Sequence, residues 1–301
     1  MEDQAAGVGT DRRGFGLACA AVVAGFAGAG AASQRAVAGQ ASRPEPSQPD
    51  RSAYRGGGGP IRPALKIGMI AGGNSLLEKF RIARQAGFAG VELDGPFPQS
   101  QSEVIDAKGE TGIEVPGLVC SAHWGKPLSH PDAAVRAECV AAMERSLRQA
   151  KAVGATSVLL VPGVVNQGIE YADAWSRSLE EIRRLLPTAE ELGVSIVLEN
   201  VWSNFLLSPV ETVKYIDELQ SPAVGMHFDI GNVVRYGWPE HWITALGDRV
   251  YKLDVKEYSR QKQNDEGLWK GFQVEIGEGD CGWPRVVSAL ERIGYRGGWA
   301  A

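Results

Sequence analysis

Short apolar runs alternate with longer segments of helical periodicity from residue 65 to the end of the chain. Runs of this length, rich in β-branched and other apolar residues, are typical of parallel strands that are covered on both faces. Between the runs, apolar residues recur at the spacing of amphipathic helices, as in Leu76, Phe80 and Ala83. The predicted strands are 65–70, 90–93, 115–120, 157–161, 195–198, 224–228 and 250–255, and residues 297–301 begin another.

A glycine directly after a helical segment marks the return of the chain into the next strand. Glycine accepts the left-handed conformation that commonly ends a helix. This pattern occurs at Gly87, Gly154, Gly193 and Gly294. The repeated strand-then-helix unit predicts an α/β fold, a (β/α)8 TIM barrel with the last helix missing. A doubly wound open sheet would satisfy the periodicity nearly as well.

The first 64 residues lack this repeat. Arg12 and Arg13 precede an uncharged stretch, rich in Ala, Gly and Val, that ends near residue 33 in small residues. This order resembles a twin-arginine (Tat) export signal over 1–33 and predicts an exported, periplasmic protein. The alternative is a chance arginine pair on a cytoplasmic protein. Residues 34–64, rich in Pro, Ser, Gln and Gly, predict a disordered linker before a barrel at 65–301.

Composition and charge exclude several classes of protein. A chain that is 44% hydrophobic and 22% charged is neither collagen-like, nor a polytopic membrane protein, nor wholly disordered. We expect no stable membrane span once the signal is removed. The net charge is -5, and the first 64 residues hold only five of the 36 acids, so the predicted barrel is acidic and no nucleic-acid partner is expected. The four cysteines include no C-x-x-C pair and predict buried thiols.

Carboxylates follow the apolar runs of three consecutive predicted strands. They are Glu199, Asp229 and Asp254. The C-terminal strand ends of a TIM barrel form its active-site mouth, and period-two alternation allows all three side chains to face inward. Converging carboxylates repel one another, and a divalent cation would compensate their charge. Each acid taken alone is equally well explained as a helix cap or ion-pair partner.

Basic and imidazole side chains lie on the same predicted strands. His227 could join the metal ligands, but we favour a buried, hydrogen-bonded histidine inside the barrel. Lys252 and Lys256 are expected to be charge partners of the carboxylates, and Lys256, nearer the rim, could also contact substrate. Oxygen ligands alone favour Mg²⁺ or Mn²⁺ over Zn²⁺.

Further candidates lie on the second and third predicted strands. His123 and Trp124 lie in the loop after the third strand, where a tryptophan could stack on a sugar and a histidine could bind a hydroxyl. Packing of this loop explains both residues equally well. Glu92, near the end of the second strand, could reach the same mouth. The G-x-G-x-x-G match at 277–282 contains two acids and comes last in the chain, so we interpret it as a turn before a helix and not as a dinucleotide site.

The strand-end segments resemble the sugar phosphate isomerase/epimerase branch of the xylose isomerase-like TIM barrel superfamily. The matching segments are 197–209, 227–234, 252–260 and 277–284. The resemblance implies one divalent metal ion, Mn²⁺ or Mg²⁺, held by Glu199, Asp229 and Asp254, the last of which stands where many relatives have histidine. A fourth ligand, a glutamate, would lie beyond residue 299. We therefore expect either a fragment or a protein that has lost part of its proton-transfer machinery.

The resemblance also implies a substrate and a reaction. The expected partner is a small sugar or sugar phosphate, and Glu199 would move a proton on a carbon beside the carbonyl, through an enediolate. Arg260 matches an arginine that contacts substrate, and Asn232 stands where several relatives have a substrate-binding histidine. Asn200, in the strand-five segment, is also expected to bind substrate. Isomerase and epimerase both stay open. The alternatives are a non-catalytic carbohydrate-binding barrel and a sugar lyase or dehydratase. Assembly into a homo-oligomer is also left open.

Overall fold

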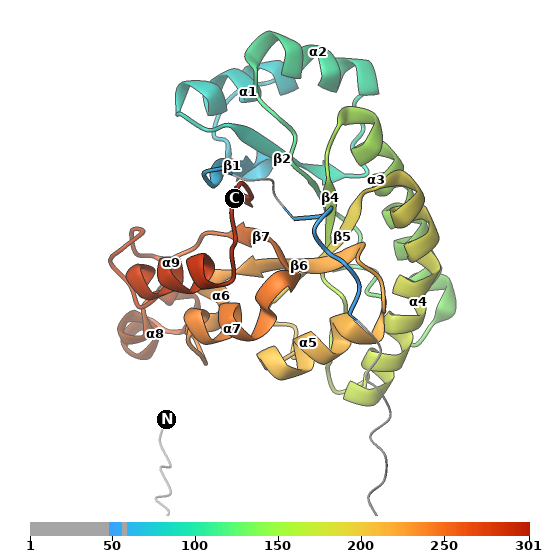
Figure 1. Ribbon diagram of the computed structural model, residues 1–301, viewed down its shortest axis with the longest axis vertical. Coiled ribbons are helices and arrows are strands. Elements are labelled where there is room, and N and C mark those ends of the chain that lie inside the picture. The colour runs from blue at the N-terminus through green and yellow to red at the C-terminus, as the bar shows by residue number, and fades with distance from the viewer. Residues whose placement is uncertain (1–47, 56–58) are drawn as a thin grey trace, which may run out of the picture. The chain divides into compact units, whose positions relative to one another are not determined.

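The computed structural model describes residues 48–55 and 59–301. Within them, eight parallel strands pair in chain order and close into a barrel, with β1 beside β8. Helices lie between successive strands and surround the barrel (Figure 1). The predicted (β/α)8 TIM barrel is therefore confirmed. The predicted signal at 1–33 lies outside the described residues.

The strands are short, and most begin where the apolar runs begin. Their bounds are β1 (Arg62–Lys66), β2 (Gly90–Gly95), β3 (Leu118–Cys120), β4 (Ser157–Leu160), β5 (Ser195–Glu199), β6 (Val224–Asp229), β7 (Val250–Asp254) and β8 (Trp299–Ala300). The first strand differs most from its prediction of 65–70. It starts at Arg62 because Arg62 and Pro63 pair with Trp299 and Ala300 of β8, and it gives way after Lys66 to a turn of 3-10 helix.

The helices end where local sequence signals stop them. They are α1 (Leu76–Gln85), α2 (Gln101–Thr111), α3 (Ala133–Val153), α4 (Tyr171–Leu192), α5 (Pro209–Glu218), α6 (Ile230–Val234), α7 (Pro239–Leu246), α8 (Arg260–Glu266) and α9 (Trp283–Arg292), with 3-10 turns η1 (Ile67–Met69), η2 (Gly247–Arg249) and η3 (Leu268–Phe272). Gly154 and Gly193 adopt left-handed conformations after α3 and α4, as expected. Over the described ranges, every helix is too short or too polar to span a bilayer.

The barrel interior is divided into an apolar and a polar layer. Leu159, Val197 and Tyr251 form a small buried apolar cluster, separate from the main core between strands and helices. Val197 and Glu199 face the same side of β5 because side chains alternate along a strand. The apolar cluster therefore lies below the charged strand ends, toward the opposite end of the barrel.

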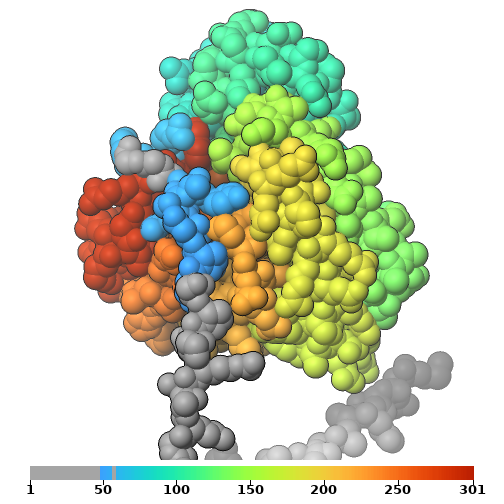
Figure 2. Space-filling model, turned by 45° about the vertical axis from the view of Figure 1, so that its right-hand side comes forward, coloured from blue at the N-terminus to red at the C-terminus, as the bar shows by residue number. Residues whose placement is uncertain are grey.

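Residues 48–55 lie against the N-terminal end of the barrel, which differs from the linker predicted for 34–64. The Arg51 guanidinium is buried and donates to the Val224 carbonyl (2.9 Å) and to Asp217 (3.2 Å). The Tyr54 ring stacks on Tyr251 at 6.3 Å. Figure 2 shows this blue segment on the surface, between the orange and red C-terminal elements and the yellow α4 region. The polar, glycine-rich composition of residues 34–64 gives no sign of this contact, because much of the contact is made by the side chain of a single buried arginine.

Candidate functional site

The three predicted metal ligands end three neighbouring strands and converge. Glu199 is the last residue of β5, Asp229 of β6 and Asp254 of β7. Asp229 pairs directly with Asp254 across the sheet. Each of the three residues offers a carboxylate oxygen, and these oxygens all lie within 4.8 Å of one another. The strand register thus gathers at one point the three acids that the sequence places at separate strand ends.

This arrangement fits a hard divalent cation. Mg²⁺ and similar ions bind carboxylate oxygens at about 2.0 to 2.6 Å, so oxygens this close together can share one ion. Asp254 Oδ2 is buried and accepts no well-aligned hydrogen bond among the described residues, and its cationic neighbour is the Lys66 ammonium at 3.0 Å. A buried carboxylate oxygen without a hydrogen bond is costly unless a cation lies beside it. Lys66 partly meets this need, and the all-oxygen donor set agrees with the predicted ligands.

Two lysines partly neutralise the three acids. The Lys256 ammonium pairs with Asp229 and lies 3.7 Å from Glu199 Oε1. Lys66, at the end of β1, lies 3.0 Å from Asp254 Oδ2. The Lys256 side chain is 39% exposed, so it can turn toward solvent when a cation or substrate enters. Lys66 was missed in the sequence analysis because it interrupts an apolar run, although such a charge in a strand is itself a signal.

Burial and mutual repulsion separate the acidities of the three carboxyl groups. Burial, Asp254 and Asp229 together raise the pKa of Glu199 to about 8, against the opposing effect of Lys256. Burial also raises the pKa of Asp229. The pKa of Asp254 is lowered, because His227 and the lysines outweigh the effect of burial. In the metal-free protein, Glu199 therefore keeps a proton near neutral pH.

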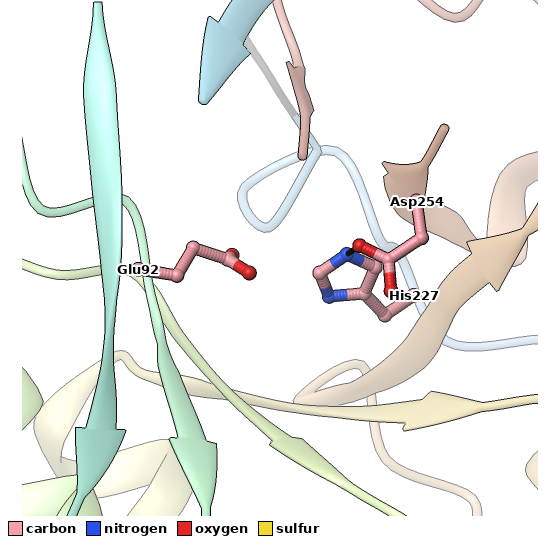
Figure 3. Close-up of side chains that lie close together, drawn as sticks. All are labelled: Glu92, His227 and Asp254. Atoms are coloured by element: carbon pink, nitrogen blue, oxygen red, sulfur yellow. Dashed lines mark hydrogen bonds and ion pairs between the residues drawn. The ribbon is translucent and has the colours of Figure 1, made fainter. Parts of the chain in front are cut away.

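A second cluster lies beside the first and shares Asp254 with it. Glu92, His227 and Asp254 also bring ligand atoms within 4.8 Å of one another. Figure 3 shows Glu92 pointing across the barrel interior toward His227 and Asp254. His227 is buried and its Nε2 lies 2.9 Å from Asp254 Oδ1, so the expectation of a buried, hydrogen-bonded histidine is confirmed. This contact orients Asp254 from within the barrel.

Glu92 lies among basic groups and not at the open mouth. It is 2% exposed and lies 3.5 Å from Lys66 and 3.4 Å from Lys252. The pKa of Glu92 is lowered, because His227 and these lysines outweigh burial. Lys252 also donates to the Pro116 carbonyl. A β-carbon on Gly117 would lie 2.6 Å from Lys252 Nζ, so a larger residue there would displace the lysine from this position.

Asn200 and Asn232 hold Asp229 in place. The Asn200 side chain accepts from the Asp229 backbone N–H and donates to its carbonyl, both at 2.8 Å. The Asn232 N–H donates to Asp229 Oδ1 at 2.8 Å, and its side chain donates to the Asn200 carbonyl. The structure thus shows a positioning role for both residues, and their predicted contact with substrate stays a prediction.

The remaining predicted substrate residues lie around the mouth without touching the three acids. Arg260, at the start of α8, donates to the Val234 and Gly237 carbonyls. His123 is buried, and its Nδ1 accepts from the Val161 N–H at 3.3 Å. Trp124 packs edge-on against His123 at 5.3 Å and is 56% exposed. His123 thus packs the loop, whereas Trp124 is open to contact with a ligand.

Comparison with known proteins points to one family. The model of the family described as xylose isomerase-like TIM barrel matches residues 80–299. L-ribulose-5-phosphate 3-epimerase UlaE of Salmonella typhi is 24% identical over 240 residues, which are 76% of this chain and 82% of that protein.

Solved structures show the same architecture. D-allulose 3-epimerase from Methylomonas sp., in complex with D-allulose, has a TM-score of 0.67 and 18% identity, over 82% of this chain and 85% of that one. The 3-keto-D-glucoside 4-epimerase YcjR of E. coli has a TM-score of 0.68 and 16% identity, over 80% and 90%. At these identities the likeness shows the fold.

Proposed function

We propose that this chain, which belongs to the xylose isomerase-like TIM barrel family, is a divalent-metal-dependent isomerase or epimerase of a sugar or sugar phosphate. The observation that carries the proposal is the convergence of Glu199, Asp229 and Asp254 within 4.8 Å at the C-terminal strand ends. The relative UlaE, an epimerase of a phosphorylated ketose, supports the same class of substrate.

In the proposed reaction, the side chains at this site would bind the metal ion, transfer a proton and stabilise negative charge on the substrate. Glu199, Asp229 and Asp254 would hold a Mn²⁺ or Mg²⁺ ion, which supplies electrophilic polarisation of a carbonyl when bound. Glu199 Oε would accept the proton from the carbon beside that carbonyl, because it is the outermost of the three carboxylates. Lys256, partly exposed beside it, would offset the negative charge that develops on the sugar oxygen.

The central test follows exchange of substrate hydrogen with solvent. A ketopentose and a ketohexose, each with and without a phosphate ester, are incubated with the protein and Mn²⁺ in D₂O. We expect deuterium at the carbon beside the carbonyl, and loss of about a hundredfold or more in rate for Glu199→Gln. Glu110→Gln, a surface change on α2, is the matched control and should exchange normally.

The same experiment separates the alternatives. Binding of a sugar without exchange would identify a non-catalytic carbohydrate-binding barrel. A product that is lighter than the substrate by one water would identify a dehydratase. Metal dependence has its own test in calorimetric titration with Mn²⁺. Binding that is absent, or that is unchanged in Asp229→Ala, would refute the metal site.

A further inference from the structure

We propose that the barrel carries a second ligand site, for a small oxyanion, at the end opposite the catalytic mouth. A cavity of about 210 Å³ opens there, between the N-terminal ends of the strands and residues 53–55. The aromatic rings of Tyr54, Tyr251 and Trp299 line it. A single water needs only about 10 to 15 Å³ of such space, so the cavity has room for a polyatomic ion.

The charged side chains that line this cavity are all basic, although Glu92 lies behind the lining, 3.4 Å from Lys252 Nζ. Arg55, Arg62 and Lys252 contribute to the lining, and none of its described residues is a carboxylate. The Arg62 guanidinium lies over the Trp299 ring, with its carbon 3.8 Å from the ring centroid, and this cation–π contact helps to hold it at the cavity. Concentrated positive charge beside apolar walls raises the local concentration of anions.

Hydrogen-bond donors of the right kind lie next to these charges. Ser157 on β4 and Ser195 on β5 are partners in the strand register, and each is 2% exposed. Their hydroxyls line the cavity and make no side-chain hydrogen bond within the described ranges. A β-carbon on Gly117 would lie within 2.9 Å of both Ser157 Oγ and Lys252 Nζ, which places hydroxyl and ammonium side by side, and the Glu92 carboxylate that pairs with the lysine lies 3.1 Å from the same point.

These groups are the elements of oxyanion recognition. Phosphate and sulfate are bound by charge-assisted hydrogen bonds from lysine and arginine and by neutral donors such as hydroxyls. A cation would meet three basic side chains here. Lys252 is already paired with Glu92 at 3.4 Å, so Arg55 and Arg62 carry the charge that an uncharged ligand would leave without a counter-ion. The shared chemistry is therefore a small oxyanion, either free phosphate or the phosphoryl group of a small metabolite. The site needs no metal and is independent of the proposed reaction.

Calorimetric titration of the full chain in metal-free buffer tests this site. The ligands are inorganic phosphate, sulfate and glycerol 3-phosphate, with glycerol as the uncharged control. We expect saturable one-to-one binding of the anions and none of glycerol. Tighter binding of glycerol 3-phosphate would identify a phosphorylated metabolite as the source, and tighter binding of phosphate would identify the free ion.

Matched variants locate the binding. Arg62→Gln and the double change Ser157→Ala with Ser195→Ala should each weaken binding at least about tenfold, because each removes donors from the cavity. Arg81→Gln, on the outer face of α1, and Lys256→Met, at the catalytic mouth, should leave it unchanged. Phosphate should also raise the melting temperature of the wild type but not that of the serine double variant. Absence of binding, equal affinity in all variants, or loss in Lys256→Met would overturn the proposal.

Discussion

Neutralising Glu199 should stabilise the metal-free protein although it destroys the proposed metal site. Burial and two neighbouring acids raise the pKa of Glu199 from its ordinary 4.5 to about 8. A carboxyl group whose pKa is raised on folding stabilises the fold below its unfolded pKa, and this stabilisation is lost as pH rises through the folded value. The loss therefore begins near pH 4.5 and is complete above about pH 8.

The size of the effect follows from the same pKa difference. Each tenfold change in proton affinity corresponds to about 1.4 kcal/mol, so ionising Glu199 in the folded chain costs roughly 3 to 5 kcal/mol. Glutamine at this position resembles the protonated acid and avoids this cost. The free energy of unfolding of Glu199→Gln should match that of the wild type near pH 4.5 and exceed it by several kcal/mol above about pH 8.

Urea denaturation in EDTA, followed by circular dichroism across this pH range, measures the difference, with Glu110→Gln as the surface control. Added Mn²⁺ should reverse the order, because only the wild type keeps the full ligand set. A stability difference between Glu199→Gln and wild type that stays constant with pH would refute the reasoning, and so would a variant that is less stable throughout.

Three further changes probe the contacts around this site and at the opposite end of the barrel. Gly117→Ala would place a β-carbon 2.6 Å from Lys252 Nζ, and we expect a loss of about 1 to 3 kcal/mol in urea denaturation; unchanged stability would show that the lysine moves away freely. Asn200→Ala should weaken Mn²⁺ binding about 10- to 100-fold in calorimetry by releasing Asp229, while near-ultraviolet circular dichroism stays native; full affinity would remove its positioning role. Arg51→Ala should cost about 2 to 4 kcal/mol by deleting buried charged hydrogen bonds, and a loss no larger than that of Arg81→Ala would show that the N-terminal segment is weakly attached.

The sequence predicts the position of a site residue best when that position depends only on the strand that carries the residue. Glu199, Asp229 and Asp254 each follow an apolar run, and period-two alternation with barrel closure is enough to bring them together. Lys66 escaped this reasoning, because its partner Asp254 is distant in the chain and only the barrel register makes them neighbours.

Side-chain direction and long-range docking account for the other differences. Asn200 follows Glu199 directly, yet its amide turns toward the Asp229 backbone and not toward the open mouth. Composition predicted a linker through residue 64, whereas Arg51 and Tyr54 are held by contacts with β6, α5 and β7. Local composition gives no information on a binding pocket for one arginine that forms only in the folded barrel.

The contacts of Arg51 also determine when the N-terminal segment can dock during synthesis of the chain. Its two acceptors, Asp217 and Val224, come 166 and 173 residues later in the chain. During translation this segment leaves the ribosome early, but its docking surface is absent until the sixth strand has emerged and paired. The first described segment of the polypeptide is thus among the last to find its native place, and nascent chains that end before residue 224 should leave it open to added protease.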